Sequence, residues 1–239
     1  MKLFNFLLLT TLVLVTFNTN ILAQNKNKQD ILASIGNSSK WNNTNYILFT
    51  SLSKTALLKE RAFLIDKTTG QVRFDGTTID NNIIVLLFNF KSKALDKAYI
   101  NGKLSESTAD IHYEDVLSQL FKDTKLLFLP MLVISSNKDK ISIGQEKILN
   151  TQKLTEINFD NIYNIDNSIL QGTIYINNKG EVKEYLINES TYTVSDIKDI
   201  GDGNLLPTKF VNINIPSLST KFNIVASFMD IESNKFTDL

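Results

Sequence analysis

The sequence predicts a mainly β fold, an incomplete antiparallel β-barrel of about eleven strands with one or two helices covering the concave face. Three observations predict it. Short β-prone segments recur along the chain, turn residues separate them, and many of the segments place apolar side chains at alternate positions. Antiparallel sheets with one buried and one solvated face show this alternation. A long sheet of this kind curls into a barrel or half-barrel.

The predicted strands form two groups on either side of a helical region. In the first half of the chain they span residues 46–51, 61–66, 71–75, 83–90 and 97–100. In the second half they span residues 140–144, 154–159, 172–177, 181–187, 209–215 and 221–230. Asp- and Asn-Gly pairs at 75–76 and 101–102 supply turns, as hairpins require. The order of these elements is a β-meander.

Two helices are predicted. Residues 28–35 form a short helix that Gly36 ends. Residues 112–122 carry apolar side chains at i, i+3, i+4, i+7 and i+8, which places them on one stripe of a second helix. We expect this stripe to lie on the sheet. Pro130 is expected to end the apolar run that precedes it, because proline is disfavoured inside a helix.

Composition and charge exclude several classes of function. The 239 residues include 25 basic and 25 acidic side chains, one His and no Cys. A chain without net charge lacks the basic excess that nucleic-acid binding needs, so we expect no nucleic-acid partner. Without Cys there is no disulfide, thiolate nucleophile or acylated lipoprotein N-terminus. Any triad or histidine metal site would need His112, for which a solvated helical position is expected. We therefore predict no enzymatic activity, no cofactor and no metal.

One acidic turn offers oxygen atoms of the type that calcium binds. Asp196, Asp199, Asp202 and Asn204 surround two glycines there. Their spacing does not match an EF-hand loop, and the glutamate that completes such a loop is missing. We therefore expect an ordinary exposed turn here.

The N-terminus has the pattern of a signal peptide. Lys2 precedes an apolar region over residues 3–17, and Ala23 is a small residue of the kind that signal peptidase requires. A retained membrane anchor would need about 20 apolar residues in succession. We predict cleavage after Ala23, which leaves residues 24–239 as one periplasmic or secreted domain, expected to be a monomer.

Several short strings of the mature chain resemble the exported LolA/LolB-like proteins. These are Ile35–Gly36 followed by Trp41, DKTTGQVR at 66–73, YINGK at 99–103, the amphipathic helix running into FLP at 128–130, and LLPTKF at 205–210. The resemblance covers nearly the whole mature chain. It implies a half-barrel whose apolar hollow receives a fatty acyl chain, a lipid or a lipoprotein, with membrane-bound donor or acceptor proteins as partners. It also implies an arginine under the lid, and Arg61 and Arg73 are the only arginines.

The candidate cavity residues are large and apolar or aromatic. They are Trp41, Phe63, Phe74, Phe88, Phe90, Tyr113, Leu117, Phe121, Phe128, Met131, Phe159 and Phe228. The lid or gating candidates are Arg73 and Pro130. The alternative for each aromatic residue is a place in a packed core, since protein interiors are normally close-packed. We predict an exported, non-enzymatic carrier or binding protein for an acyl chain, lipid or lipoprotein. The alternative is an exported all-β interaction or structural protein with a packed core and no small ligand.

Overall fold

The computed structural model describes residues 28–105, 112–149, 151–201 and 203–239. Within these residues, 13 strands form one sheet in the order β6-β5-β4-β3-β2-β1-β13-β12-β11-β10-β9-β8-β7. Each strand is antiparallel to its neighbours. The sheet is open, because its two edge strands, β6 and β7, do not pair with each other in the described part of the chain. The predicted fold class is confirmed, with two strands more than expected.

The strands and helices have the following bounds. The first group of strands is β1 (Tyr46–Ser51), β2 (Leu58–Asp66), β3 (Gln71–Thr78), β4 (Ile83–Asn89), β5 (Ala94–Ile100) and β6 (Lys103–Leu104). The second group is β7 (Ile141–Leu149), β8 (Gln152–Tyr163), β9 (Ile169–Ile176), β10 (Val182–Ile187), β11 (Ser190–Asp199), β12 (Leu205–Asn212) and β13 (Thr220–Phe228). Residues 28–35 are helical, as predicted, and α2 (Ser38–Asn43) and α3 (Tyr113–Ser135) follow. Short 3-10 segments lie at η1 (Lys138–Lys140), η2 (Pro216–Leu218) and η3 (Ser233–Phe236).

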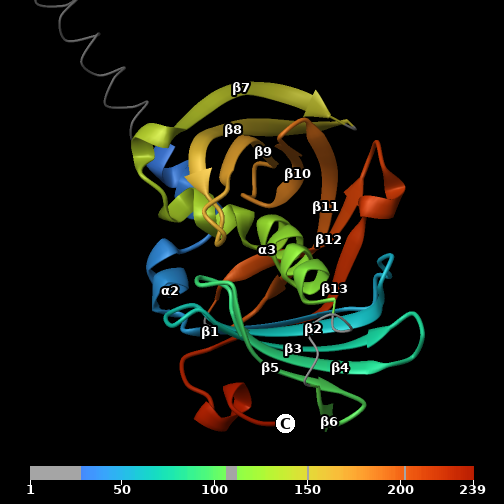
Figure 1. Cartoon of the computed structure of the whole chain (residues 1–239). Coiled ribbons are helices and arrows are strands. Elements are labelled where there is room, and N and C mark those ends of the chain that lie inside the picture. Colours follow the sequence, from blue (N-terminus) through green and yellow to red (C-terminus); the bar gives the residue numbers. More distant parts are fainter. Residues whose placement is uncertain (1–27, 106–111, 150, 202) are drawn as a thin grey trace, which may run out of the picture.

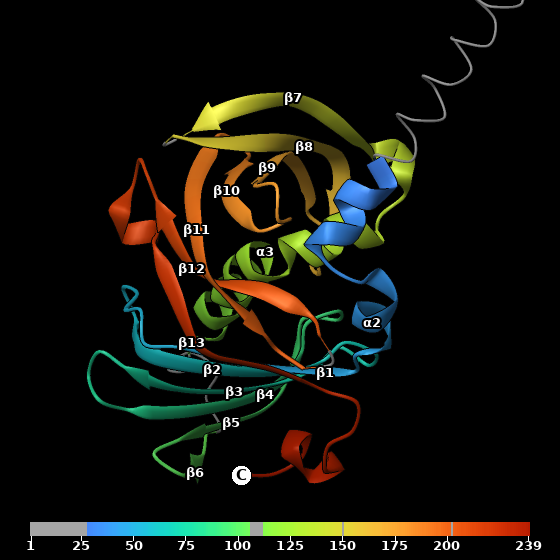
Figure 2. The ribbon, with the colours of Figure 1, turned by 180° about the vertical axis from the view of Figure 1, so that it is seen from behind.

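The long helix α3 connects the two edges of the sheet. The chain builds the sheet outward from β1 to β6, passes through α3, and returns from β7 to β13, which pairs with β1. In Figure 1, α3 lies inside the curve of the sheet, between the strands β7–β11 above it and β1–β5 below it. The reverse view in Figure 2 shows the same enclosure. The helix therefore occupies the concave face, where the alternating apolar side chains of the strands point.

The expected end of the helical region before Pro130 is wrong. The helix α3 has 23 residues and contains Pro130 in its interior. Proline removes one helical hydrogen bond and clashes with the preceding turn, at a cost of about 3 kcal/mol. Every side chain from 126 to 131 is buried, and full burial of one large apolar side chain contributes about 1.5–3 kcal/mol. Packing therefore outweighs the local cost, and the helix combines an amphipathic first half with a second half buried on nearly all sides.

Strand β11 was not predicted, although its sequence contains a β-prone run. Residues 190–194 read Ser-Thr-Tyr-Thr-Val, and Tyr192 and Val194 are buried at alternate positions. The strand pairs with β10 and β12. The acidic turn considered for calcium follows it, and there the Asp199 carboxylate accepts hydrogen bonds from the backbone N–H groups of Gly201 and Gly203. The Asp199 carboxylate therefore stabilises the turn that follows it through these two hydrogen bonds.

The signal-peptide prediction for residues 1–23 lies outside the described residues. Of the helices that the structure describes, none combines the length and the apolar composition that crossing a bilayer requires.

A partly buried lysine attaches α2 to the sheet. Lys67 Nζ donates a hydrogen bond of 2.5 Å to the carbonyl oxygen of Trp41 and lies 4.1 Å from the centroid of the Trp41 ring. Burial lowers the pKa of Lys67 from 10.5 to about 8. Between these two values the unfolded chain binds more protons than the folded one, so stability rises with pH there.

We expect the free energy of unfolding to gain a positive contribution as pH increases from about 8 towards 10.5, and Lys67→Met to remove it. Urea unfolding of both proteins at several pH values in this window measures the difference. Identical pH slopes for the two proteins would contradict the assignment.

Candidate functional site: the concave face and its covering helix

A continuous row of aromatic rings crosses the concave face. Neighbouring ring centroids lie 5.0–5.9 Å apart. In order across the sheet, the row consists of Tyr185, Phe210, Phe222, Phe49, Phe63 and Phe74. All of these side chains are fully buried. Tilted and edge-to-face pairs at such distances are favourable beyond their buried area. This aromatic row forms the apolar wall that faces α3.

The helix α3 packs directly on this wall. The Phe128 ring contacts Trp41 edge-on at 5.1 Å and Phe49 at 6.2 Å between centroids. At the start of the helix, Tyr113 packs against Phe88 at 5.5 Å. The buried side of α3 and the aromatic row belong to one contiguous core. In this structure, α3 thus fills the hollow of the half-barrel.

The predicted cavity residues fall into three groups. Those within the contiguous core are Trp41, Phe63, Phe74, Phe88, Phe90, Leu117, Phe128, Met131 and Phe159. Tyr113 and Phe121 are partly buried and pack against it. Phe228 lies near the end of β13 and is 38% exposed. The structure therefore brings most of the set to the interface between the sheet and α3 and leaves Phe228 away from it.

A buried ion pair attaches α3 to the sheet. Arg61 of β2 meets Asp123 of α3 through two contacts, Nε to Oδ2 at 2.6 Å and Nη2 to Oδ1 at 2.9 Å, and both side chains are at most 2% exposed. Arg61 also donates to the Ser53 carbonyl oxygen at 2.6 Å and to Thr220 Oγ1 at 3.1 Å. Gln119 Nε2 donates to Asp123 Oδ1 at 2.8 Å. The two charges are neutralised and hydrogen-bonded.

The sequence contains a signal for this pair that the sequence analysis did not use. Arg61 alternates in phase with Phe63 and Ile65, so it lies on the core face of β2. Asp123 follows Leu120 by three residues and lies on the buried stripe of α3. A charged residue at a core position in each of two elements predicts that they pair, because an isolated buried charge is very costly.

Arg73, the arginine proposed for the lid, has other partners. It belongs to the opposite face of β3, where it pairs with Asp75 at 2.8 Å and donates to the carbonyl oxygen of Asp238 at 2.8 Å. The hydrogen bonds with Asp75 raise the pKa of Arg73. Lys97 Nζ also donates to the carbonyl oxygen of Thr237, at 2.6 Å. Arg73 therefore attaches the C-terminal segment to the sheet, whereas Arg61 contacts α3.

A pocket of about 460 Å³ opens beside the buried ion pair. We call it the Arg61 pocket. Its lining comes from α3, from the chain between β1 and β2, from the start of β11 and from the β12–β13 connection. Residues of the ion pair itself form part of the wall. The pocket therefore connects solvent with the polar contact between helix and sheet.

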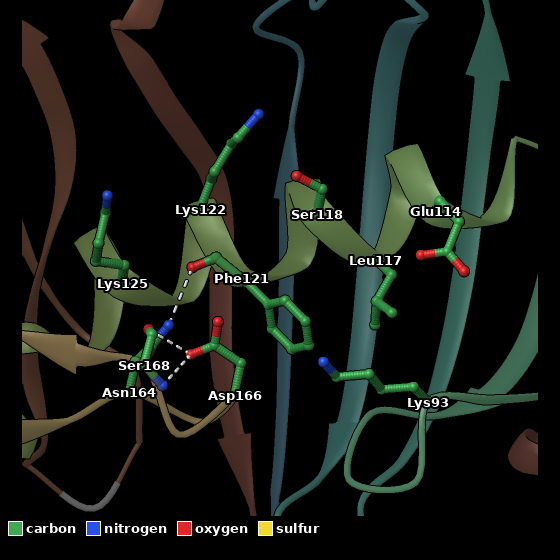
Figure 3. Close-up of a pocket in the computed structure, with 10 residues that line it drawn as sticks. All are labelled: Lys93, Glu114, Leu117, Ser118, Phe121, Lys122, Lys125, Asn164, Asp166 and Ser168. Carbon is green, nitrogen blue, oxygen red and sulfur yellow. Dashed lines mark hydrogen bonds between the residues drawn. The ribbon is translucent and has the colours of Figure 1, made fainter.

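A second pocket of about 370 Å³ lies along α3 at the gap between the two parts of the sheet. Figure 3 shows Leu117 and Phe121 pointing into it from the helix, with Lys93 opposite. Asn164 donates to the Phe121 carbonyl oxygen at 3.3 Å, while Asp166 forms hydrogen bonds with Ser168. This pocket shares Lys122 and Lys125 with the Arg61 pocket, and Glu114 and Asp166 add two acidic groups to its lining.

One polar atom of the aromatic row has no partner. Among the described residues, the hydroxyl group of Tyr185 makes no hydrogen bond, although the side chain is fully buried. Burial raises the pKa of Tyr185 well above 10.0. The neutral phenol remains a donor facing the interior, at a cost of about 1–3 kcal/mol when unsatisfied.

We therefore expect Tyr185→Phe to raise the free energy of unfolding by up to about 1–3 kcal/mol, since the substitution removes an unpaired donor and keeps the ring. Urea unfolding at pH 7 measures the change. A clear loss of stability would show that the hydroxyl group has a partner.

Fold and site together define a class, an open antiparallel half-barrel whose concave face is covered by one long helix. No protein-family model and no curated protein matches the chain. Among solved structures, the chain is similar to a DUF1329 family protein from Desulfovibrio piger, with a TM-score of 0.33 and 9% sequence identity. The match covers 88% of this chain and 96% of that one.

Proposed function

We propose that this protein is an exported, non-enzymatic carrier or binding protein for a lipid, fatty acyl chain or lipoprotein, held between the aromatic row and α3. The observation that carries the proposal is the buried pair of Arg61 and Asp123. Replacing such pairs with apolar residues often leaves proteins equally or more stable, so stability alone does not account for this pair. An ion pair can exchange partners, and here it connects a helix that covers an apolar hollow to the wall of that hollow.

The two halves of α3 suit a cover that opens from one end. Residues 113–125 have one buried and one exposed side, whereas residues 126–131 are buried. Pro130 lacks the N–H group that would bond to the Leu126 carbonyl oxygen, so the helix is weakened between the two halves. We propose that the first half moves while the second half stays in the core, with Pro130 as the hinge.

Energetics support exchange of helix contacts for ligand contacts. Burial of a methylene group contributes about 0.8 kcal/mol, so about ten methylenes contribute about 8 kcal/mol. That amount is comparable with the contribution of the buried side chains Val116, Leu117 and Leu120, at about 1.5–3 kcal/mol each. An acyl chain is therefore large enough to replace the first half of α3 on the aromatic row.

The signal-peptide pattern at residues 1–23 supports export, and the expected partners are the lipid or lipoprotein itself and membrane-bound proteins that deliver or receive it. The absence of net charge is compatible with a ligand bound by apolar contacts.

A neutral fluorescent probe tests the proposal without involving any head group. We expect N-phenyl-1-naphthylamine to bind to the purified protein with increased fluorescence and to be displaced by dodecanol. Native mass spectrometry should show the dodecanol adduct. Absence of both signals would overturn the carrier function and favour the packed interaction protein, the alternative that the filled concave face supports.

Distance measurements test the movement of α3. Because the sequence has no Cys, introduced cysteines are the only labelling sites. With spin labels at Ser118→Cys on α3 and Thr193→Cys on β11, dodecanol is expected to change the distance distribution. A control pair within the sheet, Gln71→Cys and Thr193→Cys, is expected to keep its distance. An unchanged α3 distance with ligand bound would contradict the cover.

A further inference from the structure

The Arg61 pocket is strongly basic. Lys54, Lys122 and Lys125 line it together with Arg61, and Asp123 is the only acidic residue of its described lining. Since Asp123 is already paired with Arg61, the three lysines are an unbalanced positive charge. The chain as a whole has no net charge, so this concentration of cations is a local feature.

The lysines of the pocket have no direct ion-pair partner among the described residues. Lys125 is partly buried, and burial together with the charge of Lys122 lowers its pKa, although the charge of Asp166 opposes this shift. Two cations side by side, one of them partly desolvated, favour an anion between them and Arg61.

Part of the pocket lining is apolar and belongs to the core. Leu126 and Tyr192 line it and are both at most 5% exposed. Tyr192 lies directly opposite Tyr185 in the β10–β11 pairing, and Tyr185 begins the aromatic row. The hydroxyl group of Thr220 accepts a hydrogen bond from the guanidinium, and those of Ser53 and Thr55 add further hydrogen-bonding groups to the lining. Exposed or half-buried cations beside buried apolar groups match an amphiphile whose head group is negatively charged.

We propose that the Arg61 pocket binds the anionic head group, a carboxylate or a phosphate, of an amphiphile whose hydrocarbon tail enters the hollow. The inference rests on the proposed function and names the ligand class. Arginine binds both oxyacids through two parallel hydrogen bonds, the arrangement that it makes with Asp123. The head group competes with Asp123 for Arg61, and loss of that contact releases α3 from β2. Ligand entry and opening of the cover are thereby one event.

Four amphiphiles with the same dodecyl tail test the head-group preference by displacement of N-phenyl-1-naphthylamine. They are dodecanoate, dodecyl phosphate, dodecanol and dodecyltrimethylammonium. We expect each anion to bind at least about tenfold more tightly than dodecanol, and the cation to bind most weakly. The order of the two anions distinguishes a fatty-acid from a phospholipid type of head group.

Two variants that remove the same number of positive charges test whether the preference for anions depends on the Arg61 pocket. In Lys54→Gln/Lys122→Gln/Lys125→Gln, the anions are expected to lose their advantage while dodecanol binds as before. The control Lys103→Gln/Lys153→Gln/Lys179→Gln removes the same charge from exposed positions outside the pocket and is expected to keep the preference.

The outcomes of these experiments distinguish a failure of the head-group site from a failure of the carrier function. Equal binding of dodecanoate and dodecanol would overturn the head-group site and leave the carrier function standing. A preference that survives in the pocket variant, or falls equally in the control, would overturn it too. Failure of all four amphiphiles and of the probe would refute the carrier function itself.

Discussion

Asp123→Asn is expected to lower the free energy of unfolding by about 3–5 kcal/mol, one of the largest effects of any single substitution in this chain. The substitution leaves the guanidinium of Arg61 buried without a counter-charge, while its other partners, Ser53 and Thr220, are neutral. Urea unfolding at pH 7 measures the difference from the slope and midpoint of the transition.

Two variants control for the loss of charge. Asp75→Asn breaks the more exposed pair with Arg73 and is expected to cost at most about 1 kcal/mol. The double substitution Arg61→Met/Asp123→Leu removes both charges and is expected to recover most of the lost stability. A cost of Asp123→Asn no larger than that of Asp75→Asn would show that the buried pair does not hold α3 on the sheet.

Phe128→Ala is expected to cost about 3–5 kcal/mol, because it removes a buried ring and leaves a cavity between α3 and the aromatic row. Phe128 is 1% exposed and contacts both Trp41 and Phe49. Thermal and urea unfolding measure the loss.

The matched control is Phe228→Ala on β13. Because that ring is 38% exposed, its loss is expected to cost less than about 1 kcal/mol. Similar costs for the two phenylalanines would mean that α3 does not pack on the sheet as described.

The fold class was predictable because most strands carry their own signal. Alternation in segments such as residues 71–75 places Val72 and Phe74 on one face, and the structure has them there. The full length of α3 was not predictable from local rules, since Pro130 argues against a helix and only tertiary burial overrides it. β11 was missed because its N-terminal run is short and its other end is polar.

The sequence predicts which apolar residues belong to the candidate site, but it does not predict how they are arranged in space. Which aromatic rings face α3 depends on strand pairing between distant segments, such as β1 with β13. The Arg61–Asp123 pair joins residues that are 62 positions apart. The sequence places each charge at a core position, and the fold shows the distance over which the two pair.

The order of the strands also determines when the sheet can be completed during folding. Tyr46 lies opposite Phe228 across the β1–β13 ladder, so the central seam of the sheet joins its first and last strands. Hairpins form from neighbouring residues early, whereas this seam waits for the last strand and makes folding slow. A nascent chain that stops before β13 exposes both β1 and β12 as unprotected edges, which are templates for aggregation. Synthesis of β13 is thus expected to protect these two strands as well as to complete the sheet.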